Sequence, residues 1–191
     1  MDPTIEAAHP ALRQALSQIT AQSTGNDVAR QIPLVAALAE EYDHAIVLVQ
    51  EAIPEKPETF RHTCFQHAFE LVNPPRLIVD IATLYPDVYP NADFVGYLIE
   101  GQLFEVPPSD IQDDDVVVYF EAGIPRHAGK IHGGLIVSKW GTAHYWKHRL
   151  WEVPATYGSE VRFFRPIERK KSEIAFVRFA ERELGISFLG D

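Results

Sequence analysis

Residues 116–140 read VVVYFEAGIPRHAGKIHGGLIVSKW. The run opens with five β-branched and aromatic residues in succession, which is typical of a buried strand. Two later segments, residues 127–131 and 135–140, flank the sequence His132-Gly133-Gly134, whose glycines can adopt the positive φ that a tight hairpin requires. The stretch therefore predicts a buried strand followed by an antiparallel hairpin.

The chain before these strands is predicted to be helical. Three segments have apolar residues at three- and four-residue spacing, the pattern of a helix that lies on a core: residues 11–19, 32–49 and 77–84. Another helix is predicted from Cys64 to Asn73, because Thr63 and Gln66 form a capping box at its start and two prolines follow its end. Cys64 therefore falls in the first turn of a helix.

After Pro90 the pattern changes from helix to sheet. Residues 94–104 contain only short apolar runs, and residues 161–165 alternate as a further strand. A last helix is predicted with Ser172 as its N-cap and Gly185 as its C-terminal stop, and with Ile174, Val177 and Leu184 on its apolar face. Helices, then a β-meander, then a closing helix indicate an α+β fold.

The composition is that of one globular domain. The chain has 191 residues, 46% of them hydrophobic and 23% charged, which is enough to bury one core. We expect a single domain over residues 1–191, made of an N-terminal helical arm (1–55), a core (56–166) and a C-terminal helix (167–191).

The charge balance and the N-terminus bear on partners and location. The 17 Lys and Arg residues against 27 Asp and Glu residues give a net charge of −10, which disfavours binding to nucleic acid and to anionic membranes. The first residues do not have the pattern of a signal peptide, and no apolar run has the length of a membrane span. We therefore expect a cytosolic protein with neither nucleic-acid nor membrane partners.

The sole cysteine, Cys64, is the candidate nucleophile. Free amides and the positive end of the dipole at a helix start favour a thiolate, so we expect this thiol to be ionised. His127 is the candidate base, because the sheet can bring its ring to the helix end. Ser138, expected to face His127 across the hairpin, is the candidate residue that orients the imidazole, with Lys139 and His148 as alternatives.

The order of these residues resembles the NlpC-like and CHAP-like branches of the papain fold. The resemblance rests on a cysteine at a helix start, an acidic turn leading into a strand at residues 113–120, and His-Ala-Gly at residues 127–129. It implies a papain-like α+β fold with N-terminal helices, a nucleophile helix packed on an antiparallel sheet, and a C-terminal helix. It also implies Cys64 as nucleophile, His127 as base and Ser138 as the orienting residue.

A second resemblance covers residues 60–166, and the first has two departures. Ser138-Lys139-Trp140-Gly141, then His148, then Tyr157-Gly158 is similar to a signature of an uncharacterised bacterial family. Asp114 stands where the NlpC-like pattern has glycine, and the third histidine of that pattern has no equivalent here. The substrate class is therefore not carried over with the fold.

The function that the resemblance implies is that of a cysteine peptidase or amidase. Such a thiol hydrolase would act on a peptide, a peptidoglycan-like compound or a small amide or ester, without a cofactor or a metal. One alternative is a non-catalytic protein on the same scaffold that binds a peptide or partner through Trp140, Trp146 and Trp151. The other is a zinc protein that uses His62, Cys64 and His67, with His127 or His132 as a fourth ligand.

Overall fold

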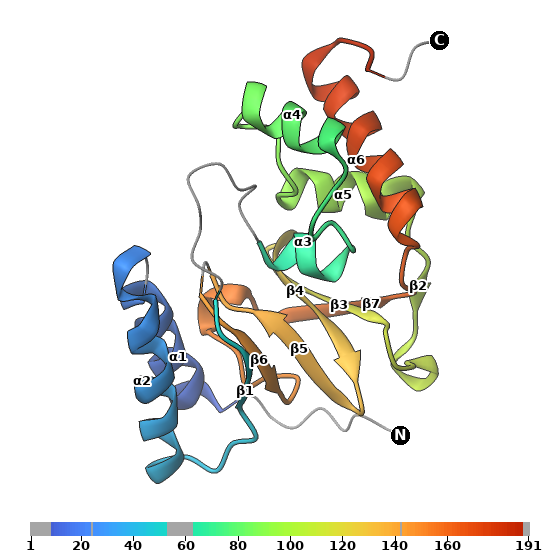
Figure 1. The fold of residues 1–191 in the computed structure, drawn as a ribbon. Helices are drawn as coiled ribbons and strands as arrows, with labels where there is room; N and C mark the ends of the chain where they lie inside the picture. Colours follow the sequence, from blue (N-terminus) through green and yellow to red (C-terminus); the bar gives the residue numbers. More distant parts are fainter. Residues whose placement is uncertain (1–8, 24, 53–62, 142, 189–191) are drawn as a thin grey trace.

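The computed structural model describes residues 9–23, 25–52, 63–141 and 143–188. Within them, six helices and a seven-stranded sheet form a mixed α+β fold (Figure 1). The helices are α1 (Pro10–Gln22), α2 (Gln31–Ala37), α3 (Cys64–Ala68), α4 (Arg76–Leu84), α5 (Ala92–Gly101) and α6 (Arg169–Leu184). The short 3-10 turns are η1 (Gly25–Arg30), η2 (Leu38–Glu40), η3 (Pro108–Asp110) and η4 (Ala155–Tyr157).

All neighbouring strands of the sheet are antiparallel, in the order β1-β6-β5-β4-β3-β7-β2. The strands are β1 (Val47–Gln50), β2 (Glu105–Val106), β3 (Val116–Glu121), β4 (Ile124–His132), β5 (Leu135–Lys139), β6 (Tyr145–His148) and β7 (Glu160–Phe164). The predicted strand at residues 116–120 and the hairpin that turns at Gly133-Gly134 are confirmed, because His132 pairs with Leu135. The strand predicted at residues 161–165 is confirmed as β7.

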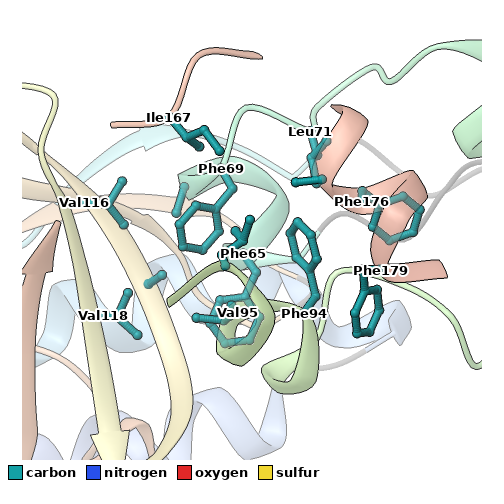
Figure 2. Packing of buried hydrophobic residues seen from close by; sticks show 14 of the residues in the cluster. Phe65, Phe69, Leu71, Phe94, Val95, Val116, Val118, Ile167, Phe176 and Phe179 are labelled. Atoms are coloured by element: carbon teal, nitrogen blue, oxygen red, sulfur yellow. The ribbon is translucent and has the colours of Figure 1, made fainter. Parts of the chain in front are cut away.

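The two faces of the sheet carry separate hydrophobic cores. Alternation along β3 sends Val116, Val118 and Phe120 to the face on which α3 and α5 pack, with α4 and α6 adding to the same core, and we call it the α3 face. Val117 and Tyr119 point to the opposite face, which packs against α1 and α2 and which we call the α1 face. Figure 2 shows the α3-face core, where the rings of the two helices α3 and α5 meet those of α6.

The start of α3 follows the prediction, and its end does not. The Thr63 hydroxyl accepts the Gln66 N–H at 3.2 Å, and the Gln66 side-chain oxygen accepts the Thr63 N–H at 2.6 Å, which completes the capping box. The helix ends at Ala68 rather than at Asn73, because Glu70 takes a left-handed φ of 60° and forms an ion pair with Lys130 of β4. A contact with the sheet thus ends the helix before the prolines do.

Two segments have a different secondary structure from the one expected. The helix predicted over residues 32–49 ends early, and Val47-Leu48-Val49 instead joins the sheet edge beside β6 as β1, in keeping with its β-branched residues. Residues 94–104 lie largely in α5, although sheet was expected there. The Asn91 side chain caps this helix by accepting the Phe94 N–H at 3.0 Å, and Phe94, Val95 and Leu98 form its buried face.

For the last helix, the predicted N-cap is wrong and the predicted apolar face is partly wrong, whereas the predicted C-terminal end is confirmed. Ser172 lies inside the first turn of α6, where its hydroxyl donates to the Phe69 carbonyl and ties α6 to the end of α3. The predicted face is only partly right: Ile174 is exposed, whereas Val177 is buried with Phe176 and Phe179. Gly185 ends the helix with a left-handed φ of 67°.

The helices predicted at residues 11–19 and 77–84 are confirmed as α1 and α4. Over the ranges that the structure describes, no helix combines the length and the apolar character that a membrane span requires. The predicted arm, residues 1–55, also supplies an edge strand of the sheet, since β1 lies within it.

Gly158, between η4 and β7, is expected to be intolerant of substitution. Its φ is +112°, and a Cβ there would lie 2.2 Å from the Phe120 carbonyl oxygen. Gly158→Ala should therefore lower the free energy of unfolding by roughly 3 kcal/mol or more, measured by urea unfolding. Gly96→Ala in α5 is the control, since no described atom beyond its own stretch of helix lies within 4 Å of its Cβ position, and it should raise the free energy of unfolding by about 0.5–1 kcal/mol. Equal stability of the two variants would show that the β3 contact is dispensable.

Candidate functional site

The Cys64 thiol lies at the capped start of α3 and is neutral rather than ionised. The backbone N–H groups of Ala128, Phe65 and Cys64 interact with the sulfur and favour the thiolate, as does the charge of Lys139. The residue keeps some contact with solvent, but its neighbours crowd the sulfur itself. That burial outweighs the other effects and raises the pKa of the Cys64 thiol to about 11. The expectation of an ionised thiol, drawn from the helix end alone, is therefore wrong.

The sulfur sits where two strands separate. The pairing of β4 with β5 runs from His132↔Leu135 to Gly129↔Ser138, while β4 itself continues to Ile124 along β3. Ala128, whose N–H interacts with the sulfur, lies just beyond the last of these β4–β5 pairs. The Cys64 sulfur is thus seated against the backbone of β4, at the residue that follows His127.

His127 is a neutral imidazole on the α1 face. It is 1% exposed, its ring stacks on Tyr157 with centroids 3.9 Å apart and planes at 12°, and the ring of Tyr119 lies 5.6 Å away. Burial lowers the pKa of His127 well below 6.5, and the nearby His148 and His67 lower it further. Its Nε2 atom is buried and has no hydrogen-bond partner among the described residues.

Ser138 belongs to a different hydrogen-bonded chain. It pairs with Gly129, two residues along β4 from His127, so the register that was expected from the sequence is wrong. Its Oγ lies 2.8 Å from His148 Nε2 and accepts the Trp140 indole N–H at 3.1 Å. His148 Nδ1 lies 2.7 Å from the Arg149 carbonyl oxygen, to which only a protonated nitrogen can donate.

This buried chain is complete and fixes the tautomer of His148. Because Nδ1 carries the proton, Nε2 accepts from the Ser138 hydroxyl, and every polar atom of the chain has a partner. Burial lowers the pKa of His148 to about 4. Among the described residues no hydrogen bond joins His127 to Ser138 or to His148, so the hydrogen-bonded chain through Ser138 is separate from the His127 ring.

Lys139 and His67 lie on the thiol side of the sheet. The Lys139 ammonium group is buried, donates to the Ala143 carbonyl at 2.8 Å, and lies 5.8 Å from the centroid of the Tyr145 ring. The His67 ring packs edge-on against the same tyrosine, with centroids 4.9 Å apart. The site thus has a buried cation whose charge acts on both Cys64 and His67.

His67 is a second neutral imidazole, one turn after Cys64 in α3. Burial lowers the pKa of His67 to about 4, with the charges of Lys130 and Lys139 adding to the effect. Its Nε2 atom, like that of His127, is buried without a hydrogen-bond partner in the part of the chain that the structure describes. Both imidazoles are therefore neutral near pH 7, and they differ in position. His67 can thus serve as the control for substitutions of His127.

Tyr157 is the residue that sequence reasoning missed as part of the site. Its ring stacks on His127, its hydroxyl accepts the Gly141 N–H at 3.0 Å, and it interacts electrostatically with Cys64. Burial raises the pKa of Tyr157 above its ordinary value. The sequence offered one sign of it, the Tyr157-Gly158 pair, which was interpreted only as part of the resemblance to an uncharacterised bacterial family.

The described residues do not build the alternative sites as expected. Trp140 and Trp146 are buried in the α1-face core, and Trp151 lines a separate pocket of about 430 Å³ together with Leu150 and Phe163. No group of three metal-ligating side chains occurs within the described ranges. The proposed zinc ligand His62 lies outside them, and His132 is exposed at the end of β4.

Of the three residues predicted for the site, Cys64 packs against the α3-face core with its sulfur at the backbone of β4, whereas the side chains of His127 and Ser138 lie on the α1 face. No hydrogen bond between the Cys64 sulfur and the His127 ring is present in the described part of the chain. Comparison with protein-family models, curated proteins and solved structures found no match to this chain. The function is therefore inferred from the geometry and chemistry of these residues.

Proposed function

We propose that the protein is a thiol hydrolase or acyltransferase of papain-like, NlpC/CHAP-type architecture, in which Cys64 attacks an amide or ester carbonyl and His127 moves the proton. One observation carries the proposal: the Cys64 sulfur, at a capped helix start, lies against the backbone N–H of Ala128, the residue next to His127. The packing of α3 on an antiparallel sheet supports the same reading. A cytosolic location belongs to the proposal, since a reducing compartment keeps a lone thiol reduced.

The resting pair is neutral, which decides how the proton moves. Burial raises the pKa of Cys64 to about 11 and lowers the pKa of His127 well below 6.5, so thiol and imidazole coexist near pH 7. His127 therefore accepts the thiol proton while the sulfur attacks the carbonyl carbon, rather than before it. Catalytic hydrogen bonds between base and nucleophile are often long or poorly aligned before substrate binds, and they tighten in the complex with substrate.

The later steps return every group to its starting state. The imidazolium of His127 donates its proton to the leaving amine or alcohol as the tetrahedral intermediate collapses to a thioester on Cys64. His127 then takes a proton from water, whose oxygen attacks the thioester carbonyl, and the acid product leaves as the thiol is re-formed. With an amine or alcohol in place of water, the same steps give acyl transfer.

Fixed groups near the sulfur can stabilise the negative charge that develops. The Cys64 backbone N–H is the proposed donor to the oxyanion, because it lies at the free end of α3. The buried Lys139 ammonium adds a positive charge that favours anionic sulfur. These groups are already in place before the reaction, so they need no reorganisation during it.

Trapping the acyl-enzyme tests the proposal. The full chain is mixed with p-nitrophenyl acetate at about pH 8 and quenched in acid, and the intact mass is measured over time with peptide mapping of any adduct. The expected result is one acetyl group on Cys64 that forms in a burst and is then released. Because the sequence has one cysteine, a thioester adduct identifies this residue without ambiguity. A folded protein that remains unacetylated at Cys64 would overturn the proposal.

The non-catalytic alternative has one specific observation in its favour, the raised pKa of the Cys64 thiol. In that case the half-buried Trp151 and the pocket of about 430 Å³ beside it are the place for a peptide or partner, since Trp140 and Trp146 are core residues. Trapping separates the two functions, because only the enzyme forms a thioester.

A further inference from the structure

The Tyr157 ring lies against the proposed base and is held from several sides. It stacks on the His127 imidazole with centroids 3.9 Å apart and planes only 12° from parallel. Its hydroxyl accepts the Gly141 N–H at 3.0 Å, which ties the far end of the ring to the turn after β5. The next residue, Gly158, lies so close to the Phe120 carbonyl that no side chain fits there. The ring therefore has little freedom to move away from His127.

The loop that carries Tyr157 is bound by α1. The buried Arg13 donates from Nε to the Val153 carbonyl at 3.2 Å and from its terminal nitrogen to the Gly158 carbonyl. Ser17, one turn later in α1, accepts the Thr156 N–H at 3.3 Å. These bonds hold the backbone on both sides of Tyr157, so α1 fixes the position of the Tyr157 ring relative to the sheet.

We propose that Tyr157 is a positioning residue for His127: its ring, anchored through η4 to Arg13 of α1, fixes the plane of the imidazole and excludes water from one of its faces. The proposal rests on the function proposed above, because it gives a role to the base of that reaction. It also gives α1 a role at the site, since Arg13 and Ser17 of this helix hold the loop that carries Tyr157.

The surroundings of His127 explain why exclusion of water matters. The titratable groups around it are Tyr119 on β3 and Tyr157 on η4, whose rings contact the imidazole, and His148 on β6 and His67 on α3, which act on it electrostatically. Burial raises the pKa of both tyrosines and lowers the pKa of both histidines, so all four are uncharged near pH 7. The Arg13 cation lies next to this group, where it interacts with Tyr119. No anion in this set would stabilise an imidazolium, and the stacked ring keeps out the water that could.

The test follows the titration of the His127 ring by NMR in Tyr157→Leu, Tyr157→Phe and wild-type protein. The His127 signal is assigned by its loss in His127→Ala, and each titration stays within the pH range where the protein is folded. Tyr157→Leu should raise the pKa of His127 by about one unit or more, a roughly tenfold shift in the protonation equilibrium, because water reaches the exposed ring face. Tyr157→Phe keeps the stack and should titrate like the wild type.

A control variant separates positioning from general loosening of the fold. Tyr97→Leu removes a ring that packs on Phe179 over the α3-face core, away from the α1 face. It should leave the His127 titration unchanged. An unchanged titration in Tyr157→Leu, or an equal shift in Tyr97→Leu, would overturn the positioning role.

Measuring acetylation of Cys64 in the same variants keeps the two proposals apart. If Cys64 is acetylated, the dependence of its rate on pH should move with the His127 titration in Tyr157→Leu. If wild-type Cys64 is not acetylated while the titration still shifts, the proposed function fails and the packing role of Tyr157 stands. If acetylation occurs and the titration does not shift, the proposed function stands and the positioning role fails.

Discussion

Lowering the pH from about 7.5 to about 5 should destabilise the protein by several kcal/mol. The cause is a set of buried imidazoles that are neutral in the folded state. Burial lowers the pKa of His67 and of His148 to about 4, and the pKa of His127 lies well below its ordinary value of 6.5. In the unfolded chain each of these rings binds a proton near pH 6.5.

The sign follows from the protons that each state binds. Between pH 6.5 and the folded pKa values, the unfolded state holds more protons, so the free energy of unfolding falls as the pH falls. Stability is full above about pH 6.5 and is lost progressively toward about pH 4. A pKa shift of this size corresponds to roughly 3 kcal/mol for His148 at full effect, out of a typical total of about 5–15 kcal/mol.

Urea unfolding at several pH values, followed by fluorescence of the buried Trp140 and Trp146, measures this loss. Most carboxylates titrate below about pH 5, so the window above it reports mainly the histidines. His67→Gln should reduce the slope by up to about 1.4 kcal/mol per pH unit, because the buried His67 ring is one of the groups that the unfolded chain protonates first. Equal stability at about pH 7.5 and about pH 5 would mean that the rings are not held neutral.

Local patterns in the sequence were enough for the elements that local contacts form. The apolar run at residues 116–120 and the glycines at 133–134 identified a strand and a hairpin, and Thr63 with Gln66 identified the start of α3. Each of these signals involves residues within a few positions of one another. The α+β class followed from their order.

The errors occurred where distant parts of the chain meet. The end of α3 is set by an ion pair between Glu70 and Lys130, and the segment 47–50 is a strand because β6 is beside it. The register that pairs Ser138 with Gly129 depends on which side chains fit the α1-face core. No pattern within one segment contains this information.

The charge state of the site was beyond sequence reasoning for a related reason. The capped helix start that favours a Cys64 thiolate is visible in the sequence, whereas the burial that outweighs it arises from the packing of α3 on the sheet. The stacking of Tyr157 on His127 likewise joins residues far apart in the sequence, through a loop that α1 holds in place. The residue types of a site can thus be read from the sequence before their protonation states can.

Replacing the proposed base should slow acetylation of Cys64 far more than replacing the other buried imidazole. His127→Ala should lower the rate with p-nitrophenyl acetate about 10²–10⁴-fold near pH 7, the usual contribution of a positioned general base. His67→Ala should lower it less than about tenfold, although His67 has the same unpartnered Nε2 among the described residues and a similar lowering of its pKa. Cys64→Ala should abolish thioester formation.

The dependence on pH distinguishes loss of a base from loss of structure. With a neutral thiol and a neutral imidazole at rest, the wild-type rate should change little between about pH 7 and about pH 8.5, because neither group titrates there. Without His127, Cys64 can react only in the fraction of molecules whose thiol has already lost its proton to the solvent. The rate should therefore rise about tenfold per pH unit toward the Cys64 pKa of about 11. Equal losses in His127→Ala and His67→Ala, or a flat profile in His127→Ala, would show that His127 does not take the proton. A steep profile in His127→Ala alone assigns the proton transfer to His127, because a damaged fold lowers the rate at every pH without changing its slope.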